Sequence, residues 1–461
     1  MSLDLKKVKK IYIVGIKGSG VVAFAEIFHT QGKEVVGSDV DETFFTDETL
    51  KRLGIRFYEG FNVENVKKEM PIDLIIYSTT YNENNNREIR YAKENNIDII
   101  SYPELIGLFL KPHFGIAVCG THGKTTTTAM LALAMKEAGA DPTAIIGSKV
   151  KQLKSNVMIG KSNYFIIEAD EYQNKLSKYD PLGVILTSID YDHPDYFKTF
   201  NDYKKVFEEF IKKIPKHGFL AAWGESADVV QIAKKAKCRI IFYGIFANEQ
   251  LENDLREECE KMNVAIIKVP SDLSLDIPGK HNLLNATAVI AVGDHLALDR
   301  DKIIKSLKEY RGAARRFELI GESNGAILID DYAHHPEEIR ATLAAAQEKY
   351  PSRNTICVFH PHTYSRTRVL LDEFSQSFEN ADEVIVLDIY GSAREKDTED
   401  IHSKDLVKKI MKYKQNVEYI PTIEECYAYL RDKIDQNDVV ITMGAGNVWE
   451  LNAMLIDQKI I

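Results

Sequence analysis

The residues best suited to chemistry lie in one stretch, GIAVCGTHGKTTTT at 115–128. It predicts a buried strand, a glycine loop and a helix starting near Thr125, an arrangement that turns backbone N–H groups toward an anion. In such loops the lysine, here Lys124, reaches the β- and γ-phosphates of a nucleotide, and the next hydroxyl binds Mg²⁺. The loop is a shortened variant, because Gly120 precedes Gly123 by only three residues. The alternative is a tight turn with a chance lysine. The predicted nucleotide-binding residues are Gly120, Thr121, His122, Gly123, Lys124, Thr125 and Thr126.

Carboxylates that could bind a metal ion follow the next predicted strand. The segment NYFIIEADEY places Glu168, Asp170 and Glu171 within four residues. Carboxylates this close repel each other unless a cation neutralises them. Glu168 stands where a metal-binding acid follows a strand in phosphate-loop enzymes, although a solvated acidic turn is the alternative. His193 follows the apolar strand GVILTSID among several aspartates, so it is either a second metal ligand or a capping or surface residue.

A second glycine loop lies near the start of the chain. A buried strand, KIYIVG, is followed by GIKGSG, a helix, and a strand that ends at Asp39. This order is typical of a Rossmann-like unit, although Lys17 replaces the middle glycine of G-x-G-x-x-G. Asp39 comes 24 residues after Gly15, where it could hold a ribose hydroxyl or cap a helix. Ser78 ends a further strand, and ligands bind at such strand ends. The candidate binding residues here are Gly15, Lys17, Gly18, Ser19, Gly20, Asp39 and Ser78.

Two further motifs lie in the second half of the chain. The sequence IPGKHNLLN predicts a helix with His281 and Asn285 on one face. Asn285 could contact an adenine edge or form a polar pair in the core. The sequence YRGAARRFELIG places Arg315 and Arg316 at a predicted hinge into the third domain. Paired arginines suit a phosphate clamp, and a solvated basic turn is the alternative.

Length and composition limit the class of protein. The chain has 461 residues, enough for about three domains, and 44% apolar residues, enough for real cores. A net charge of −10 argues against a general nucleic-acid surface. Five scattered cysteines fit a reducing cytosol and no structural zinc. No apolar stretch approaches a membrane span, so we expect a soluble, cytoplasmic protein that binds neither nucleic acid nor a membrane.

Alternating strands and helices predict a three-domain α/β protein. We expect a Rossmann-like domain at residues 1–112, a central phosphate-loop domain at 113–313, and a second Rossmann-like domain at 314–461. In the last domain, apolar strands end in DDYAHHP, HPHTYSRT and GAGN. Parallel strands bring such ends to one edge, which should face the phosphate loop.

The chain resembles the Mur ligases in eight motifs that occur in the same order along its whole length: GTHGKTTTT, EADEY, TSIDYDHPDYF, GKHNLLN, RRFE, DDYAHHPEEI, HPHTYSRT and GAGN. The motifs are most similar to those of the alanine-adding members. The resemblance implies that the first domain binds a UDP-sugar, the second binds ATP, and the third closes over both. It implies an ATP- and Mg²⁺-dependent ligase that adds L-alanine to the carboxylate of UDP-N-acetylmuramate through an acyl phosphate, in peptidoglycan synthesis. We expect a monomer or homodimer.

The resemblance also implies roles for single residues of the central domain. Lys124 resembles the phosphate-loop lysine of the family. Thr125 and Glu168 resemble the protein ligands of one Mg²⁺, and His193 resembles a ligand of a second. Asn285 resembles the asparagine that contacts adenine.

Residues of the third domain match the family in the same way. Arg316 and Asp331 resemble residues that reach the phosphate and ribose of ATP. Tyr332, His334 and Arg366 resemble residues at the sugar-carboxylate and amino-acid end. The residues expected to take part in catalysis are Lys124, His193 and Arg316.

The sequence departs from the family pattern near the expected sugar and amino-acid end. Val21 and Val22 replace a Met and a Ser found in many alanine-adding members, Thr363 replaces an arginine of some, and EADEYQ lacks a following acid. A sister ligase that adds a tripeptide therefore stays open, although the compact spacing from EADEY to DHPD favours a single amino acid. A non-catalytic nucleotide-binding regulator and a dinucleotide oxidoreductase are further alternatives. The intact phosphate-loop and metal motifs argue against both.

Overall fold

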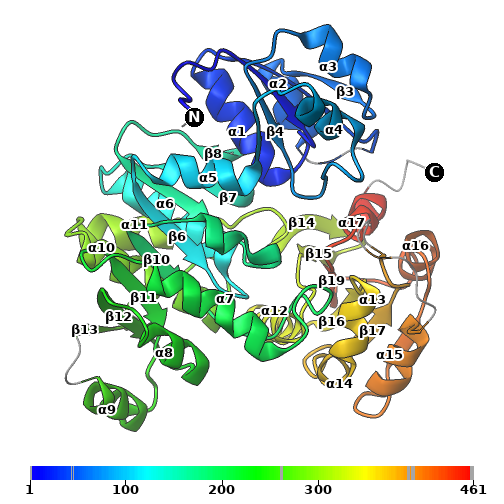
Figure 1. The fold of residues 1–461 in the computed structure, drawn as a ribbon. Coiled ribbons are helices and arrows are strands. Elements are labelled where there is room, and N and C mark those ends of the chain that lie inside the picture. Colours follow the sequence, from blue (N-terminus) through cyan, green and yellow to red (C-terminus); the bar gives the residue numbers. More distant parts are fainter. Residues whose placement is uncertain are drawn as a thin grey trace.

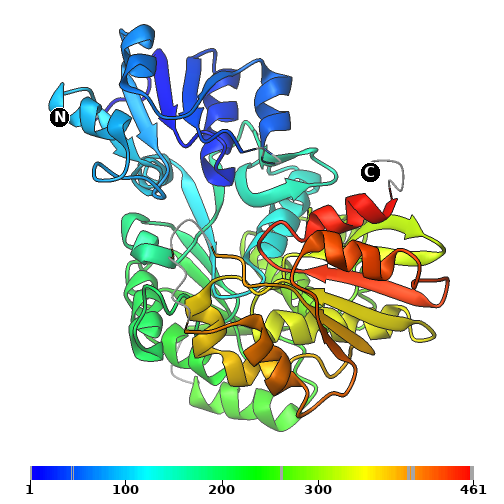
Figure 2. The same cartoon turned by 90° about the vertical axis from the view of Figure 1, so that its right-hand side faces the viewer.

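The computed structural model describes residues 3–42, 44, 46–259, 263–391, 395 and 400–456. Three α/β units follow one another along the chain, and each is built on its own sheet (Figures 1 and 2). In Figure 1 the first unit lies at the top, the central unit at the lower left and the third at the lower right. The expectation of three α/β domains is confirmed. Among the described helices, none combines the length and the apolar character needed to cross a bilayer.

The first unit has a five-stranded sheet in the order β3-β2-β1-β4-β5, with every neighbouring pair parallel. Its elements are β1 (Lys10–Val14), α1 (Ser19–Thr30), β2 (Glu34–Asp39), α2 (Asp47–Leu53), β3 (Arg56–Glu59), α3 (Val63–Glu69), β4 (Leu74–Tyr77), α4 (Arg87–Glu94), β5 (Ile99–Ser101) and α5 (Tyr102–Leu110). The strand order reverses between β1 and β4, and ligands of such sheets bind at the reversal. The first glycine loop follows β1 at this point.

The central unit has an eight-stranded sheet in the order β13-β12-β11-β10-β6-β9-β7-β8. Its elements are β6 (Phe114–Cys119), α6 (Lys124–Glu137), β7 (Thr143–Val150), β8 (Ser155–Met158), β9 (Tyr164–Glu168), the 3-10 helix η1 (Tyr172–Lys178), β10 (Gly183–Leu186), α7 (Phe200–Lys212), β11 (Phe219–Trp223), α8 (Ala227–Ala233), β12 (Arg239–Gly244), α9 (Glu249–Glu258), β13 (Val264–Lys268), α10 (Lys280–His295) and α11 (Arg300–Lys308). All its paired strands are parallel except β7 and β8.

Strand β6 is apolar throughout because both faces of the central sheet are covered. Ile116 and Val118 lie in one core with residues of α6 and α10, whereas Ala117 and Cys119 lie in the other with residues of α7. Strand β6 is thus held from both sides, and the loop that follows it starts from a rigid point.

The joint between the first and central units has an apolar core. Helix α1 contacts β7 and β8. The ring of Phe109 lies 5.8 Å from that of Phe28 and 5.6 Å from that of Phe165 in the central unit. One continuous apolar cluster therefore spans both units.

The third unit has a six-stranded sheet in the order β14-β15-β19-β16-β17-β18. Its elements are β14 (Glu318–Ser323), β15 (Ala326–Asp331), α12 (Pro336–Lys349), β16 (Asn354–Phe359), α13 (Tyr364–Val369), α14 (Leu371–Ser375), β17 (Glu383–Val386), α15 (Ser403–Ile410), β18 (Val417–Tyr419), α16 (Ile423–Leu430), β19 (Asp438–Met443) and α17 (Trp449–Ile456). Only the edge strand β14 pairs in the antiparallel sense. Helix α12 contacts α10, so this unit meets the central one there.

A buried carboxylate ties the first unit together. Oε1 of Glu88 accepts hydrogen bonds from the Tyr12 hydroxyl (3.0 Å), the Asn62 N–H (3.0 Å) and the Asn65 side-chain amide (3.1 Å). Its second oxygen accepts a bond from the Ser38 hydroxyl. The side chain is fully buried. It thus joins β1, β2, α3 and α4.

We expect Glu88→Leu to lower the free energy of unfolding by at least about 3 kcal/mol, because it leaves several buried donors without an acceptor. Thermal unfolding followed by circular dichroism measures the change. Glu94→Leu is the matched control, since Glu94 lies exposed at the end of the same helix. Equal effects of the two substitutions would contradict the assignment.

Candidate active site

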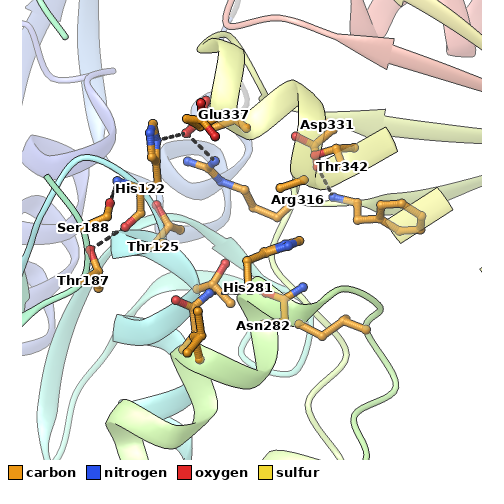
Figure 3. A pocket seen from close by; sticks show the side chains of 18 of the residues that line it. His122, Thr125, Thr187, Ser188, His281, Asn282, Arg316, Asp331, Glu337 and Thr342 are labelled. Atoms are coloured by element: carbon orange, nitrogen blue, oxygen red, sulfur yellow. Dashed lines mark hydrogen bonds and ion pairs between the residues drawn. The ribbon is translucent and has the colours of Figure 1, made fainter. Parts of the chain in front are cut away.

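A cavity of about 300 Å³ lies between the central and third units. The central unit contributes the start of α6, the chain after β10 and the first turns of α10. The third unit contributes residues around the start of β14, the end of β15 and α12. Figure 3 shows His122, Thr125 and Asn282 facing Arg316 and Asp331 across this space. Of the predicted cofactor-binding residues, the cavity is lined by His122, Gly123, Thr125, Thr126, Asn285, Arg316 and Asp331.

The glycine loop after β6 has the geometry of an anion-binding loop. Gly123 has φ +77°, and a Cβ placed on it would lie 2.5 Å from Oδ1 of Asn285. A side chain is therefore excluded by both backbone conformation and space. Helix α6 begins at Lys124, so its first N–H groups and the positive end of its dipole lie at the cavity. Gly123 also brings the loop close to Asn285.

Lys124 is held at the inner side of the loop and does not line the cavity wall. Its ammonium group donates to the backbone oxygen atoms of Gly120 and Thr121 and lies 2.9 Å from a carboxylate oxygen of Glu171. Burial lowers the pKa of Lys124, but the carboxylates of Glu171 and Asp170 raise it more, so it lies above its ordinary value. The group stays charged at physiological pH.

Two groups of oxygen and nitrogen ligands lie at the carboxyl end of the central sheet. The Thr125 hydroxyl donates to Oε1 of Glu168 at 2.9 Å. Burial raises the pKa of Glu168, against the opposing pull of Lys124 and Arg316. His193 lies in a second group, in which one ligand atom each from Asp170, Glu171 and His193 lie within 4.8 Å of one another. The side chain of His193 therefore faces Asp170 and Glu171. Both groups have the ligand types of a metal site.

The two neighbouring arginines have different partners. Arg315 is tied inside the third unit: its Nε donates to Asp330 at 2.8 Å and its Nη atoms donate to the backbone oxygens of Gly444 and Gly446. Arg316 lines the cavity, with Nη1 4.0 Å from a carboxylate oxygen of Glu338. A paired clamp is therefore not formed, because only Arg316 faces the cavity.

Asp331 closes the cavity at the end of β15. Its carboxylate accepts the backbone N–H groups of Phe317 and Ala333, both at 2.7 Å. Burial raises the pKa of Asp331 to about 6, against the opposing pull of Arg316. The two hydrogen bonds fix the orientation of this carboxylate.

Tyr332, His334 and Arg366 lie beside the cavity and not in its wall. Nδ1 of His334 lies 3.0 Å from the backbone oxygen of Tyr332, and its ring centroid lies 6.1 Å from that of His362. Arg366 reaches back to the central unit, where its Nε donates to Asp192 at 2.8 Å. The structure thus groups these three residues at the joint of the two units, outside the cavity wall.

Several residues that sequence reasoning missed hold the phosphate loop. The Ser188 hydroxyl accepts the N–H of His122 at 2.9 Å, and the Thr187 hydroxyl donates to the His122 backbone oxygen (Figure 3). Nδ1 of His122 lies 3.1 Å from Glu338 of α12. Thr187 and Ser188 follow an apolar strand, which is a signal for a ligand-binding edge. Glu338 has no such local signal, because its partner lies 216 residues away.

The candidate substrate residues of the first unit form a separate group. Gly15, with φ +79°, lies against Ser78, since a Cβ on it would meet that of Ser78 at 2.9 Å. Asp39 accepts the backbone N–H of Lys17 at 2.6 Å. The backbone oxygen of Ser19 accepts the side-chain amide of Asn156 from the central unit at 2.6 Å. Gly18 and Gly20 belong to the same loop and first turn of α1.

The side chain of Lys17 points into the first unit. The side chain is 1% exposed, and its ammonium group donates to the backbone oxygens of Val40 and Glu42 at 2.9 and 2.7 Å and lies 3.5 Å from Asp47. In this position Lys17 holds the chain between β2 and α2. Its role in substrate binding stays a prediction, and any such contact made by its ammonium group would require these bonds to break.

Comparison with known families agrees with this architecture. Residues 10–113 match the catalytic domain of the Mur ligase family, residues 118–293 match the Mur ligase middle domain, and residues 315–446 match the glutamate ligase domain of Mur ligases. Together these matches cover most of the chain. The chain belongs to the Mur ligase family, as its motifs indicated.

Curated relatives show which kind of Mur ligase this chain is most similar to among those compared. A UDP-N-acetylmuramate–L-alanine ligase of Desulfitobacterium hafniense (strain Y51) is 41% identical over 453 residues, which cover 97% of this chain and 99% of the relative. One of Clostridium botulinum (strain Okra / Type B1) is 42% identical and covers 99% and 100%. The crystal structure of the UDP-N-acetylmuramate–alanine ligase MurC of Thermotoga maritima has a TM-score of 0.78 at 24% identity, covering 97% and 98%, and shares the fold.

We expect His281 in the cavity wall to make stability depend on pH. Burial lowers the pKa of His281 to about 4, so the unfolded chain binds more protons at this residue than the folded one between about pH 4 and 6.5. Its contribution to stability is therefore present above about pH 6.5 and is lost as the pH falls toward 4.

Thermal unfolding at pH 7.5 and pH 5 tests this. Wild type should lose about 1–3 kcal/mol more of its free energy of unfolding over this range than His281→Gln does. His29→Gln is the control, because His29 lies exposed near the end of α1. If His281→Gln shows the same pH dependence as wild type, the assignment is wrong.

Proposed function

We propose that this chain is an ATP-dependent ligase that joins L-alanine to the carboxylate of UDP-N-acetylmuramate, a step of peptidoglycan precursor synthesis. The observation that carries the proposal is the cavity where the phosphate loop and α10 of the central unit meet Arg316 and Asp331 of the third unit. The full-length relatives above, at 41% and 42% identity, support the choice of substrates.

ATP fits the cavity by its chemistry. We place the adenine near His281 and Asn285 on α10, and the ribose near the fixed carboxylate of Asp331. The phosphates then lie at the N-terminus of α6, where backbone N–H groups and the helix dipole favour an anion. Arg316 faces the same space from the third unit and adds its positive charge to that of the α6 N-terminus.

The ligand groups fit Mg²⁺, which prefers oxygen donors and commonly joins carboxylates to substrate phosphates. Thr125 and Glu168 would hold one ion, and His193 with Asp170 and Glu171 a second. Glu168 is half-buried and burial raises its pKa, so a cation would offset the cost of its charge. When bound, Mg²⁺ would neutralise negative charge on the phosphates.

The proposed reaction has two steps. The muramyl carboxylate attacks the γ-phosphorus of ATP, which gives an acyl phosphate and ADP. The amine of L-alanine then attacks the acyl carbon, and phosphate leaves from the tetrahedral intermediate. Lys124 and Arg316 stabilise charge that develops on the transferred phosphoryl group. The third unit covers the cavity and keeps water from the acyl phosphate.

The glycine loop and Ser78 of the first unit are our candidates for the UDP-sugar. They lie at the reversal point of a parallel sheet, where such ligands bind. Arg366 donates to Asp192, the residue before His193. Arg366, Tyr332 and His334 are proposed for the sugar carboxylate and the amino acid.

The test is phosphate release from ATP and UDP-N-acetylmuramate with L-alanine, glycine, L-serine or the L-Ala-D-Glu-diamino-acid tripeptide. We expect strong stimulation by L-alanine, abolished by EDTA and restored by Mg²⁺. Stimulation by the tripeptide alone would make the chain a tripeptide-adding ligase. Binding of ATP without release under any condition would reject the ligase proposal.

We expect Lys124→Met to lower kcat for phosphate release by at least about a hundredfold, because one fixed positive charge at the transferred phosphoryl group is lost. Binding of UDP-N-acetylmuramate, measured by calorimetry, should remain. Lys136→Met is the control, since Lys136 lies exposed in the last turn of the same helix. An active Lys124→Met enzyme would remove Lys124 from the catalytic residues.

A further inference from the structure

The loop that follows β10, residues 187–193, is bonded to the phosphate loop through Thr187, Ser188 and Asp190. The Thr121 hydroxyl donates to the Asp190 backbone oxygen at 2.9 Å and accepts the Asp190 N–H at 2.8 Å. The Ser188 hydroxyl accepts the N–H of His122. The loop ends in His193. The positions of the phosphate loop and of His193 are therefore linked through one segment.

The same loop is where the third unit meets the central one. Oδ1 of Asp192 accepts a hydrogen bond from Nε of Arg366 at 2.8 Å, and these side chains are only 7% and 4% exposed. The backbone oxygen of Tyr191 lies 3.1 Å from Nε2 of His335. The Asp192–Arg366 pair thus joins the two units with buried charges.

The other contacts of Asp192 and Arg366 are also with protein groups. Its Oδ1 also accepts the backbone N–H of His193 at 2.7 Å. Nη1 of Arg366 donates to the backbone oxygen of His362 at 3.1 Å. The second carboxylate oxygen of Asp192 lies 3.7 Å from Nε2 of His193. Asp192 does not line the cavity, and these contacts of its carboxylate are to protein groups. A buried charge is tolerated only with its partner, so the pair favours one position of the third unit.

We propose that Asp192 is a positioning residue of the ligase reaction. Through Arg366 it seats the third unit on the loop that carries His193 and holds the phosphate loop. This buried contact thereby helps to bring the phosphate side and the amino-acid side of the site into register. This inference rests on the proposed function and deepens it, because it assigns the alignment of the two sides to a residue that contacts neither ATP nor the reacting groups.

A double-mutant cycle tests whether Asp192 acts through Arg366. We expect Asp192→Asn to lower kcat/KM for L-alanine at least about tenfold, since small misplacements of reacting groups are costly. ATP affinity, measured by calorimetry without the other substrates, should change less than twofold. In an Arg366→Lys background the same substitution should cost little further activity. Asp192→Glu, which keeps the charge, should recover part of the activity and serves if Asp192→Asn does not fold.

Glu48→Gln is the matched control. Glu48 also forms an ion pair across a joint, with Lys149 at 2.7 Å, but both side chains are exposed, so its loss should leave activity unchanged. Near-wild-type kcat/KM in Asp192→Asn would overturn the inference, as would an equal loss in both Arg366 backgrounds or an equal loss of ATP affinity. Each of these results leaves the proposed function standing if wild type responds to L-alanine. A wild type without that response overturns both.

Discussion

The hydrogen-bonded register of three neighbouring parallel strands determines where the site can form. Strand β6 pairs Val118 with Glu168 of β9, and Cys119 with Leu186 of β10. All three strands end at the same edge of the sheet. The phosphate loop, the acids after β9 and the loop after β10 therefore emerge side by side, although they are far apart in the sequence. The contacts of Thr125 with Glu168, and of His122 with Ser188, follow from this register.

The main contacts that join the first unit to the central one differ in chemistry from those that join the third unit to it. Phe28, Phe109 and Phe165 belong to one apolar cluster that fastens the first unit to the central one. The third unit meets the central one through polar contacts, such as Asp192 with Arg366 and His122 with Glu338. Polar groups at a joint need specific partners and so define one arrangement, whereas an apolar contact is less directional.

Charge pairing limits which ligands the site can bind. Lys124 is paired with Glu171, Arg366 with Asp192, and Glu338 lies between His122 and Arg316. Buried charges are stable only in such pairs, so a charged ligand has to replace or extend existing bonds. Phosphates can do this because each offers several oxygen atoms, and divalent cations can do it because each binds several oxygen ligands. A neutral ligand lacks the charge to compensate these groups.

The local motifs were predictable because neighbouring residues fold together. The strand, glycine loop and helix around Lys124 are contiguous, and a parallel sheet brings any acid that ends a strand, such as Glu168, to its active edge. The placement of Asn285 and Asp331 in the cavity rested instead on the family resemblance. The domain boundaries and the roles of single site residues stay predictions.

Only the tertiary structure decided in which direction a side chain points and which distant residue it contacts. The residue pattern alone did not separate the adjacent arginines, and only the family resemblance singled out Arg316; in the structure Arg315 is tied to Asp330, whereas Arg316 faces the cavity. Lys17 looked like a ligand-binding residue, yet its ammonium group is buried against Val40 and Glu42. The sequence by itself determined which strands end in chemical groups, because strand and loop geometry is local. Which way a side chain turns, and which distant residue it meets, depends on packing between segments up to about two hundred residues apart, and local pattern carries no information on that.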